Sequence, residues 1–134
     1  MSFDTDILIA GGGLNGTSLA LALASAGFDV TIVDPLPAPK RAAGDFDGRG
    51  YALSIASQRV LKALGVWSAV AEMTQPILDI KVTDGRPGEG PSPMMLAFDH
   101  AEIEEGPMGF LVEDRHLRPA LLRAVDDAGI TQLN

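Results

Sequence analysis

The sequence predicts an α/β fold in which a parallel sheet is accompanied by a small antiparallel β excursion. Three observations support this fold class. Short apolar runs at 6–10 and 29–34 flank a Leu- and Ala-rich stretch, which is the pattern of a strand, a helix and a second strand. Two later runs, at 78–83 and 94–98, are separated by a Gly- and Pro-rich stretch, as in a hairpin. The 134 residues, 46% of them hydrophobic, are enough for one globular domain.

The N-terminal part predicts a βαβ unit. The apolar run at 6–10 is ended by three glycines and is typical of a buried strand. Residues 15–26 predict a helix, with Gly27 just past its end. The β-branched strand at 29–34 stops at Pro35, because proline cannot donate to a ladder. Strands joined in this way pair in parallel through a right-handed crossover.

The middle of the chain predicts a long loop and then helix. Residues 40–51 combine glycines with mixed charges, and a loop of this length is usually functional or disordered. Apolar residues at helical spacing predict a helix over 54–64, with Gly65 at its end and a further turn over 66–73. We expect Ser54 and Ser57 to cap this helix, and Trp67 to be a packing residue.

The last third predicts the hairpin, one more strand and a second long helix. The strand at 78–83 alternates in polarity and is expected to be half-buried, and the acidic stretch at 99–105 predicts a solvated loop. Residues 110–112 predict a strand, and Asp114 is expected to cap the helix that follows. Residues 130–133 predict a final strand for which we find no partner.

The most informative motif is Gly11-x-Gly13-x-x-Gly16 between the first strand and the first helix. The first glycine allows a sharp turn, the second leaves room for a pyrophosphate, and the third lets helix and strand pack closely. The helix N-terminus then offers unpaired N–H groups to the phosphates. The predicted cofactor-binding residues of this loop are Gly11, Gly12, Gly13, Leu14, Asn15 and Gly16.

Asp34 completes the dinucleotide-binding pattern at the end of the second strand. Its carboxylate can accept hydrogen bonds from a ribose diol, and it disfavours a 2′-phosphate, so NADP is not expected at this site. The fingerprint itself does not distinguish FAD from NAD, since both contain ADP. The alternative is a Gly-rich turn of an ordinary α/β protein that binds no nucleotide.

Composition excludes several other functions. The net charge of −8 argues against nucleic acid as a partner. The chain has no cysteine, which excludes disulfides and thiolate chemistry and fits a cytoplasmic location. His100 and His116 are too few and too separated to predict a metal site. No apolar run approaches the roughly 20 residues of a membrane span, and the acidic N-terminus does not resemble a secretory signal.

Five segments carry a resemblance to a known family. They are DILIAGGGLNG at 6–16, DGRGYALS at 47–54, SQRVL at 57–61, LGVW at 64–67 and GFLVE at 109–113, the last followed by Leu117 and Leu121. With these segments the chain resembles the N-terminal part of the FAD-dependent aromatic hydroxylases, which are like para-hydroxybenzoate hydroxylase. Within that family it most resembles the hydroxylases of ubiquinone biosynthesis.

The resemblance implies a Rossmann-like FAD-binding domain formed by 1–75 and 107–134. It assigns 76–106 to a β-hairpin excursion belonging to the substrate-side sheet. It further implies a monooxygenase that takes electrons from NAD(P)H and hydroxylates an aromatic small molecule, a polyprenylated phenol. Such a substrate implies peripheral contact with the inner face of the membrane. No catalytic side chain is assigned within this chain, because no convincing acid–base pair is present.

The resemblance also implies two arginines at the cofactor. Arg49 is expected near the pyrophosphate or ribityl chain, where a guanidinium can donate two parallel hydrogen bonds. The alternative for Arg49 is a surface salt bridge with Asp45 or Asp47. Arg115 is the weaker candidate, and its alternative is an exposed residue in the first turn of the helix.

Two departures from the family pattern bear on function. Family members usually have Glu at the position of Asp34. The later Gly-Asp segment that binds the flavin ribityl and phosphate is missing, so the chain is expected to be the front third of an enzyme and inactive alone. Two alternatives stay open. One is an NAD-dependent Rossmann oxidoreductase, although Tyr51 is followed by Ile55 rather than the Lys of a short-chain dehydrogenase. The other is an inert fragment that self-associates through exposed strand edges.

Overall fold

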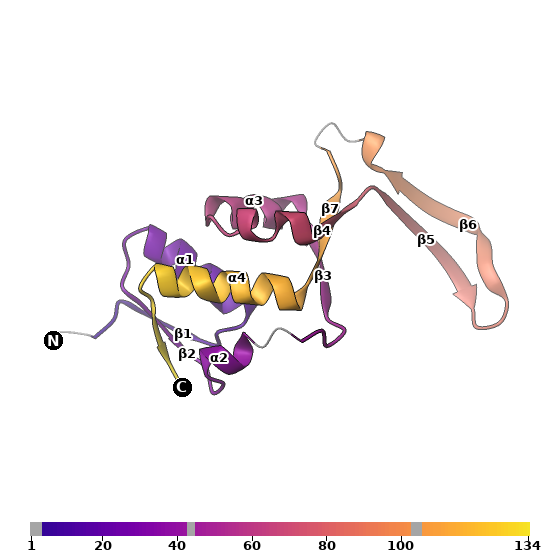
Figure 1. Ribbon diagram of the computed structural model, residues 1–134. Helices are drawn as coiled ribbons and strands as arrows, with labels where there is room; N and C mark the ends of the chain where they lie inside the picture. The colour runs from indigo at the N-terminus through magenta and orange to yellow at the C-terminus, as the bar shows by residue number, and fades with distance from the viewer. Residues whose placement is uncertain (1–3, 43–44, 103–105) are drawn as a thin grey trace.

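The computed structural model describes residues 4–42, 45–102 and 106–134, and its first layer is a parallel sheet (Figure 1). β1 (Ile7–Ala10) leads through α1 (Leu14–Ser25) to β2 (Val30–Val33), which pairs with β1 in parallel. β8 (Thr131–Leu133) pairs in parallel with the other edge of β2, giving the order β1-β2-β8. The α/β class and the βαβ unit are therefore confirmed.

The expectation that the last strand lacks a partner is wrong. β8 lies beside β2, and Thr31 is opposite Thr131 in the register. The backbone N–H of Asp34 also donates to the carbonyl of Leu133 at 2.9 Å. The long helix α4 (Asp114–Asp127) runs back along α1 and returns the chain to the sheet, so β8 pairs with a strand about 100 residues earlier (Figure 1).

A second sheet is antiparallel, with the order β3-β7-β4. β3 (Gly50–Ser54) and β4 (Thr74–Ile77) both pair with the central strand β7 (Gly109–Glu113). The sequence predicted β7 but neither of its neighbours. Both depend on pairing with a strand distant in sequence, so local pattern does not reveal them.

The predicted loop at 40–51 is shorter than expected at both ends. α2 (Ala38–Arg41) begins before it, and β3 takes its last two residues. The prolines that end the second strand favour this short helix, since Pro37 precedes it and Pro39 lies at its start, where a missing N–H costs little.

α3 (Ile55–Ala63) follows β3, and two 3₁₀ turns, η1 (Trp67–Ala69) and η2 (Ala71–Met73), lead to β4. The prediction that Ser54 caps α3 is confirmed, because its hydroxyl accepts from the N–H of Ser57 at 3.1 Å. The same prediction for Ser57 is wrong, because Ser57 lies within α3. The prediction that Asp114 caps α4 is wrong. The N-cap is Glu113, which makes no side-chain cap, and Asp114 is the first helical residue.

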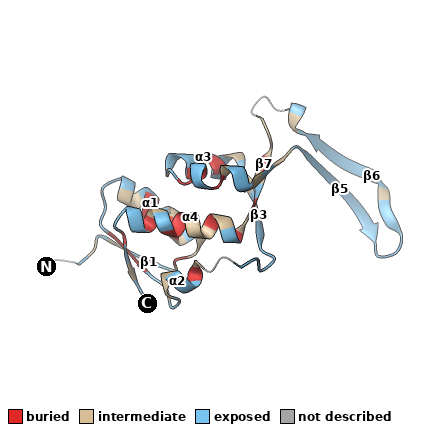
Figure 2. Cartoon of the chain, in the orientation of Figure 1, coloured by how far each residue is buried: buried red, intermediate tan, exposed pale blue. Residues whose placement is uncertain are grey.

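The hairpin of β5 (Asp79–Arg86) and β6 (Gly90–Asp99) projects away from the rest of the molecule (Figure 1), and a third 3₁₀ turn, η3 (His100–Glu102), follows it. The acidic loop expected at 99–105 begins with the end of β6 and this 3₁₀ turn, and residues 103–105 lie outside the described residues. Both strands are confirmed, but they extend through most of the stretch expected to be a loop, and the prediction of a half-buried strand is wrong. Every residue of β5 is exposed, as Figure 2 shows. Ile80 lies opposite Phe98 and Val82 opposite Leu96, so one face of the hairpin is apolar.

The hydrophobic core lies between α1, α4 and the parallel sheet, where Figure 2 shows the buried residues. Ile32 and Val125 are completely buried. On the other side of α4, Trp67 meets Phe110 edge to face, with ring centroids 5.0 Å apart, which confirms Trp67 as a packing residue. None of the helices in the described part of the chain is long and apolar enough to span a bilayer.

Candidate nucleotide-binding site

The glycine loop connects β1 to α1 and leaves the N-terminus of that helix open. Gly11 has φ +107°, a conformation that favours glycine, and its N–H donates to the carbonyl of Val33 at 2.8 Å. The N-cap of α1 is Gly13, with no side-chain cap and no acidic residue in the first turn. The first N–H groups of a helix have no intrahelical partner, so those of Leu14, Asn15 and Gly16 are available to an anion.

The glycines of the loop are required for different reasons. A Cβ on Gly16 would overlap the carbonyl oxygen of Gly11, so Gly16 allows helix and strand to pack closely. A Cβ on Gly13 would meet nothing within 4 Å, so the space beside Gly13 is open to a ligand. A Cβ on Gly12 would overlap the guanidinium of Arg41, so this glycine is required by a side chain of the protein itself.

Asp34 lies against the glycine loop at the end of β2. Its Oδ2 accepts from the N–H of Gly12 at 2.7 Å, and its Oδ1 accepts from the N–H of Leu36 at 2.8 Å. These two hydrogen bonds, together with the nearby charge of Arg41, hold the pKa of the Asp34 carboxyl below its ordinary value. A carboxylate has about four acceptor positions, so Asp34 keeps the capacity to accept from a ribose hydroxyl.

An open cavity of about 880 Å³ adjoins the loop. It is bounded by the end of β1, the start of α1, β3, α3 and α4, and so it adjoins both the parallel sheet and the antiparallel sheet that contains β3. Its lining includes Gly11, Gly13, Leu14, Asn15 and Gly16 on one side and Tyr51, Ser57 and Arg118 on the other. The volume lies within the range of small-molecule and cofactor sites.

Asp114 is a buried carboxylate beneath this cavity. It accepts two hydrogen bonds from Arg118, at 2.9 and 2.7 Å, and one from the hydroxyl of Tyr51 at 2.7 Å. Burial alone raises the pKa of Asp114, but these hydrogen bonds and the positive charges outweigh burial and lower it. Burial and the Asp114 carboxylate raise the pKa of Tyr51. The cluster fixes α4 to β3 at the edge of the cavity.

The two arginines assigned by the resemblance lie in the loop before β3 and at the start of α4. Arg49 donates to Asp47 through Nε at 2.7 Å, and its Nη2 lies 3.3 Å from Asp114. The alternative of a salt bridge with Asp47 is therefore present in this structure, and the Arg49 side chain is 55% exposed. The cofactor contact of Arg49 stays a prediction.

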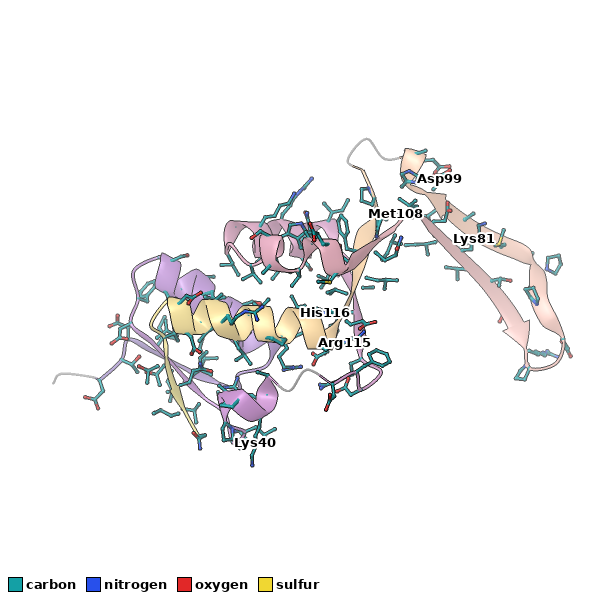
Figure 3. All side chains as sticks on the ribbon, viewed as in Figure 1. Lys40, Lys81, Asp99, Met108, Arg115 and His116 are labelled. Atoms are coloured by element: carbon teal, nitrogen blue, oxygen red, sulfur yellow. The ribbon has the colours of Figure 1, made fainter. Side chains whose placement is uncertain are left out.

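Arg115 lies at the β7 end of α4, as Figure 3 shows. It pairs with Glu113, and its guanidinium lies 5.2 Å from the ring centre of Phe46. Arg115 is absent from the lining of the cavity, and its cofactor contact also stays a prediction. Figure 3 labels its neighbour His116, whose Nε2 lies 3.7 Å from Glu113.

The sequence did not indicate that Arg41 and Arg118 lie near the site. It also did not indicate that Asp114 is a buried carboxylate that accepts several hydrogen bonds. Arg41 contacts residues up to 91 positions away, and no local signal separates it from a solvated arginine after a proline-rich stretch. Arg118 and Asp114 lie four apart on α4, which indicates an ion pair but not that the pair is buried. Their importance follows from the fold and not from a motif.

The loop, the open helix N-terminus and the cavity together fit the ADP half of a dinucleotide. Comparison with known families identifies the dinucleotide, because the model of the FAD binding domain matches residues 4–132. The chain belongs to this FAD-binding family. The match also decides between the two dinucleotides left open by the fingerprint, since the family is defined by FAD. The resemblance stated from the five segments is confirmed.

Two of the similar proteins are named as hydroxylases. The ubiquinone hydroxylase UbiL of Rhodospirillum rubrum is 44% identical over 117 residues, covering 87% of this chain and 26% of UbiL. The 3-demethoxyubiquinol 3-hydroxylase of Escherichia coli strain K12 is 38% identical over 124 residues, covering 91% of this chain and 30% of that enzyme. The chain therefore spans between a quarter and a third of the length of these relatives.

Solved structures agree on the fold. A variant of PqsL from P. aeruginosa superposes with a TM-score of 0.71 at 22% identity, over 96% of this chain and 33% of that chain. A 2-methyl-3-hydroxypyridine-5-carboxylic acid oxygenase gives a TM-score of 0.64 at 21% identity, over 94% of this chain and 30% of that chain.

Proposed function

We propose that this chain is the ADP-binding portion of an FAD-dependent aromatic hydroxylase of the ubiquinone-biosynthesis type. The observation that carries the proposal is the open N-terminus of α1 beside an unobstructed Gly13, facing a cavity of about 880 Å³. The family match and the named relatives support FAD and an aromatic small molecule as cofactor and substrate. When bound, FAD supplies the redox chemistry that transfers an oxygen atom from O₂ to the substrate.

The residues of the chain bind and orient the cofactor in this proposal. The N–H groups of Leu14, Asn15 and Gly16 hold the pyrophosphate, and Asp34 accepts from the adenosine ribose. Arg49 turns from Asp47 to a phosphate or to the ribityl chain. Arg115 is the second and weaker candidate for a cofactor contact. None of these residues performs acid–base chemistry, and we assign no catalytic residue.

The remaining expectations belong to the whole protein. We propose NAD(P)H as the electron donor and a polyprenylated phenol as the substrate, by analogy with the named ubiquinone hydroxylases. A substrate with a prenyl tail partitions into lipid, so we propose a cytoplasmic protein at the inner face of the membrane. We also propose that 1–75 and 107–134 form the cofactor domain and that 76–106 belong to the substrate side.

The test is a visible spectrum of the purified chain before and after addition of FAD, repeated after desalting. We expect a flavin band that stays with the protein. The variant Gly13→Ala should keep its circular dichroism spectrum but lose the band, because its Cβ meets no protein atom yet fills space beside the pyrophosphate. Ser25→Ala, at the far end of the same helix, is the matched control. A chain that ignores FAD but binds NAD in calorimetry would overturn the proposal.

A further inference from the structure

The side chains of Asp34 and Arg41 both form hydrogen bonds with the backbone of the same two residues. One of these residues lies in the glycine loop and the other lies shortly after β2. Asp34 accepts from the N–H groups of Gly12 and Leu36, at 2.7 and 2.8 Å. Arg41 donates to the carbonyl groups of these same residues, through Nη1 to Gly12 and through Nε to Leu36 at 2.8 Å. All four backbone groups of Gly12 and Leu36 are therefore bound by one acceptor side chain and one donor side chain.

The Arg41 side chain is held firmly in this position. Only 6% of it is exposed, and its Nη2 donates to Oε1 of Gln132 on β8 at 2.8 Å. Gln132 in turn donates to Asp126 of α4 at 3.1 Å. The planar guanidinium thus uses three of its nitrogens on three fixed acceptors, an arrangement that a lysine cannot reproduce. The carboxylate of Asp34 lies 3.9 Å from Nε and balances the buried charge.

This cluster does not line the cavity beside the start of α1. Gly11, Gly13 and Leu14 line the cavity, whereas Gly12 and Arg41 do not. The N–H of Gly12 donates to Asp34, and the guanidinium occupies the space that a Cβ on Gly12 would need. Arg41 instead lines a second open cavity of about 690 Å³, together with Leu36 and Gln132.

We infer that Arg41 is a positioning residue for the cofactor. Its hydrogen bond to the carbonyl of Gly12 acts as a latch that holds this peptide, so that the glycine loop has its binding conformation before FAD arrives. The inference rests on the proposed function, because it concerns how this loop binds FAD. A loop held in its binding conformation does not have to be ordered on association, and affinity rises accordingly. Gln132 extends the latch to β8, so the last strand of the chain also helps to position the loop.

The test uses the ¹⁵N-labelled 134-residue chain and the amide signal of Gly12. In the unsubstituted chain we expect this amide to be shifted downfield and to report the titration of Asp34 on acidification. Arg41→Met should move the signal, raise the pKa of Asp34 that it reports, and weaken FAD binding about tenfold, the effect of losing roughly one charged hydrogen bond. Arg41→Lys should recover only part of the affinity. Arg86→Met, which removes an exposed arginine on the hairpin, is the matched control.

The outcomes separate the latch from the proposed function. Unchanged Gly12 signal and unchanged FAD affinity in Arg41→Met would overturn the inference while leaving the function intact. Absence of FAD binding by the unsubstituted chain, with the expected Gly12 behaviour in both chains, would refute the proposed function and support the latch. If Arg41→Met does not fold, Gln132→Met removes one of the three acceptors instead. It should move the Gly12 signal in the same direction, and no movement would overturn the inference.

Discussion

Replacement of Asp114 by Asn is expected to destabilise the protein strongly. The side chain is 6% exposed, and it receives two hydrogen bonds from Arg118 and one from Tyr51. Asn keeps one acceptor oxygen, but its amide nitrogen must face a donor of Arg118. The positive charge then stays buried without a counter-charge.

The magnitude follows from the geometry. Removing one partner of a buried ion pair costs about 3–5 kcal/mol, and the oxygen that Asn retains places the expected loss near 3 kcal/mol. Arg49 adds little, because its side chain is more than half exposed and its attraction is screened by water. For a chain of this size the loss corresponds to a fall in Tm of about 10 °C.

The assay is thermal and urea unfolding followed by circular dichroism, with Asp47→Asn as the control. Asp47 also pairs with Arg49, but it lies exposed in the loop, so its removal should leave the unfolding temperature nearly unchanged. Equal midpoints for Asp114→Asn and the unsubstituted chain would refute the reasoning that this carboxylate holds β3 to α4.

Four further outcomes are expected. Gly16→Ala should cost about 1–3 kcal/mol, because its Cβ would overlap the carbonyl of Gly11, and an unchanged urea midpoint would contradict this. Trp67→Ala should cost about 3–5 kcal/mol in the same measurement, and a loss under 1 kcal/mol would show that the ring is not part of the core. The lowered pKa of Asp114 gives stability that is complete above its ordinary value of 3.8 and is lost as the pH falls through the lowered pKa. Acid titration of unfolding should show this loss, and Asp114→Asn should show less of it. Leu96→Ser should leave Tm unchanged, because the residue is exposed, while reducing the binding of a hydrophobic dye. A large fall in Tm would show that the hairpin packs on the body.

The parts of the fold that the sequence predicts are those decided by local pattern. The run at 6–10, the glycine motif and the helix after it follow each other within 26 residues, and each has its own signal. β3 and β4 carry no such signal, because glycine or proline interrupts them and they are strands only through pairing with β7. β8 was expected as a strand, but its place beside β2 depends on the path of α4.

The residues of the site were likewise predictable where a local motif sets them and not where distant contacts do. The motif predicts that Gly13 and Gly16 are glycines for space and packing, and the structure gives each that surrounding. The motif assigns no role to Gly12. Glycine fits there because the guanidinium of Arg41, 29 residues later, occupies the space that a Cβ would need. Asp114 was expected to cap a helix because its residue type and position favour a cap. Tyr51, 63 residues earlier, and Arg118 together draw its carboxylate inward instead.

The projecting hairpin of β5 and β6 has a consequence for how this chain can change over time. Its residues are exposed on both faces, whereas the glycine loop and the Asp114 cluster are tied into the core. A two-stranded ribbon of this kind gains little stability by itself and can open without disturbing the rest. Mutations in the ribbon therefore accumulate at almost no cost to the nucleotide fold. The two ends of the molecule can therefore change at different rates, with the sequence of the ribbon varying while that of the nucleotide fold stays constant.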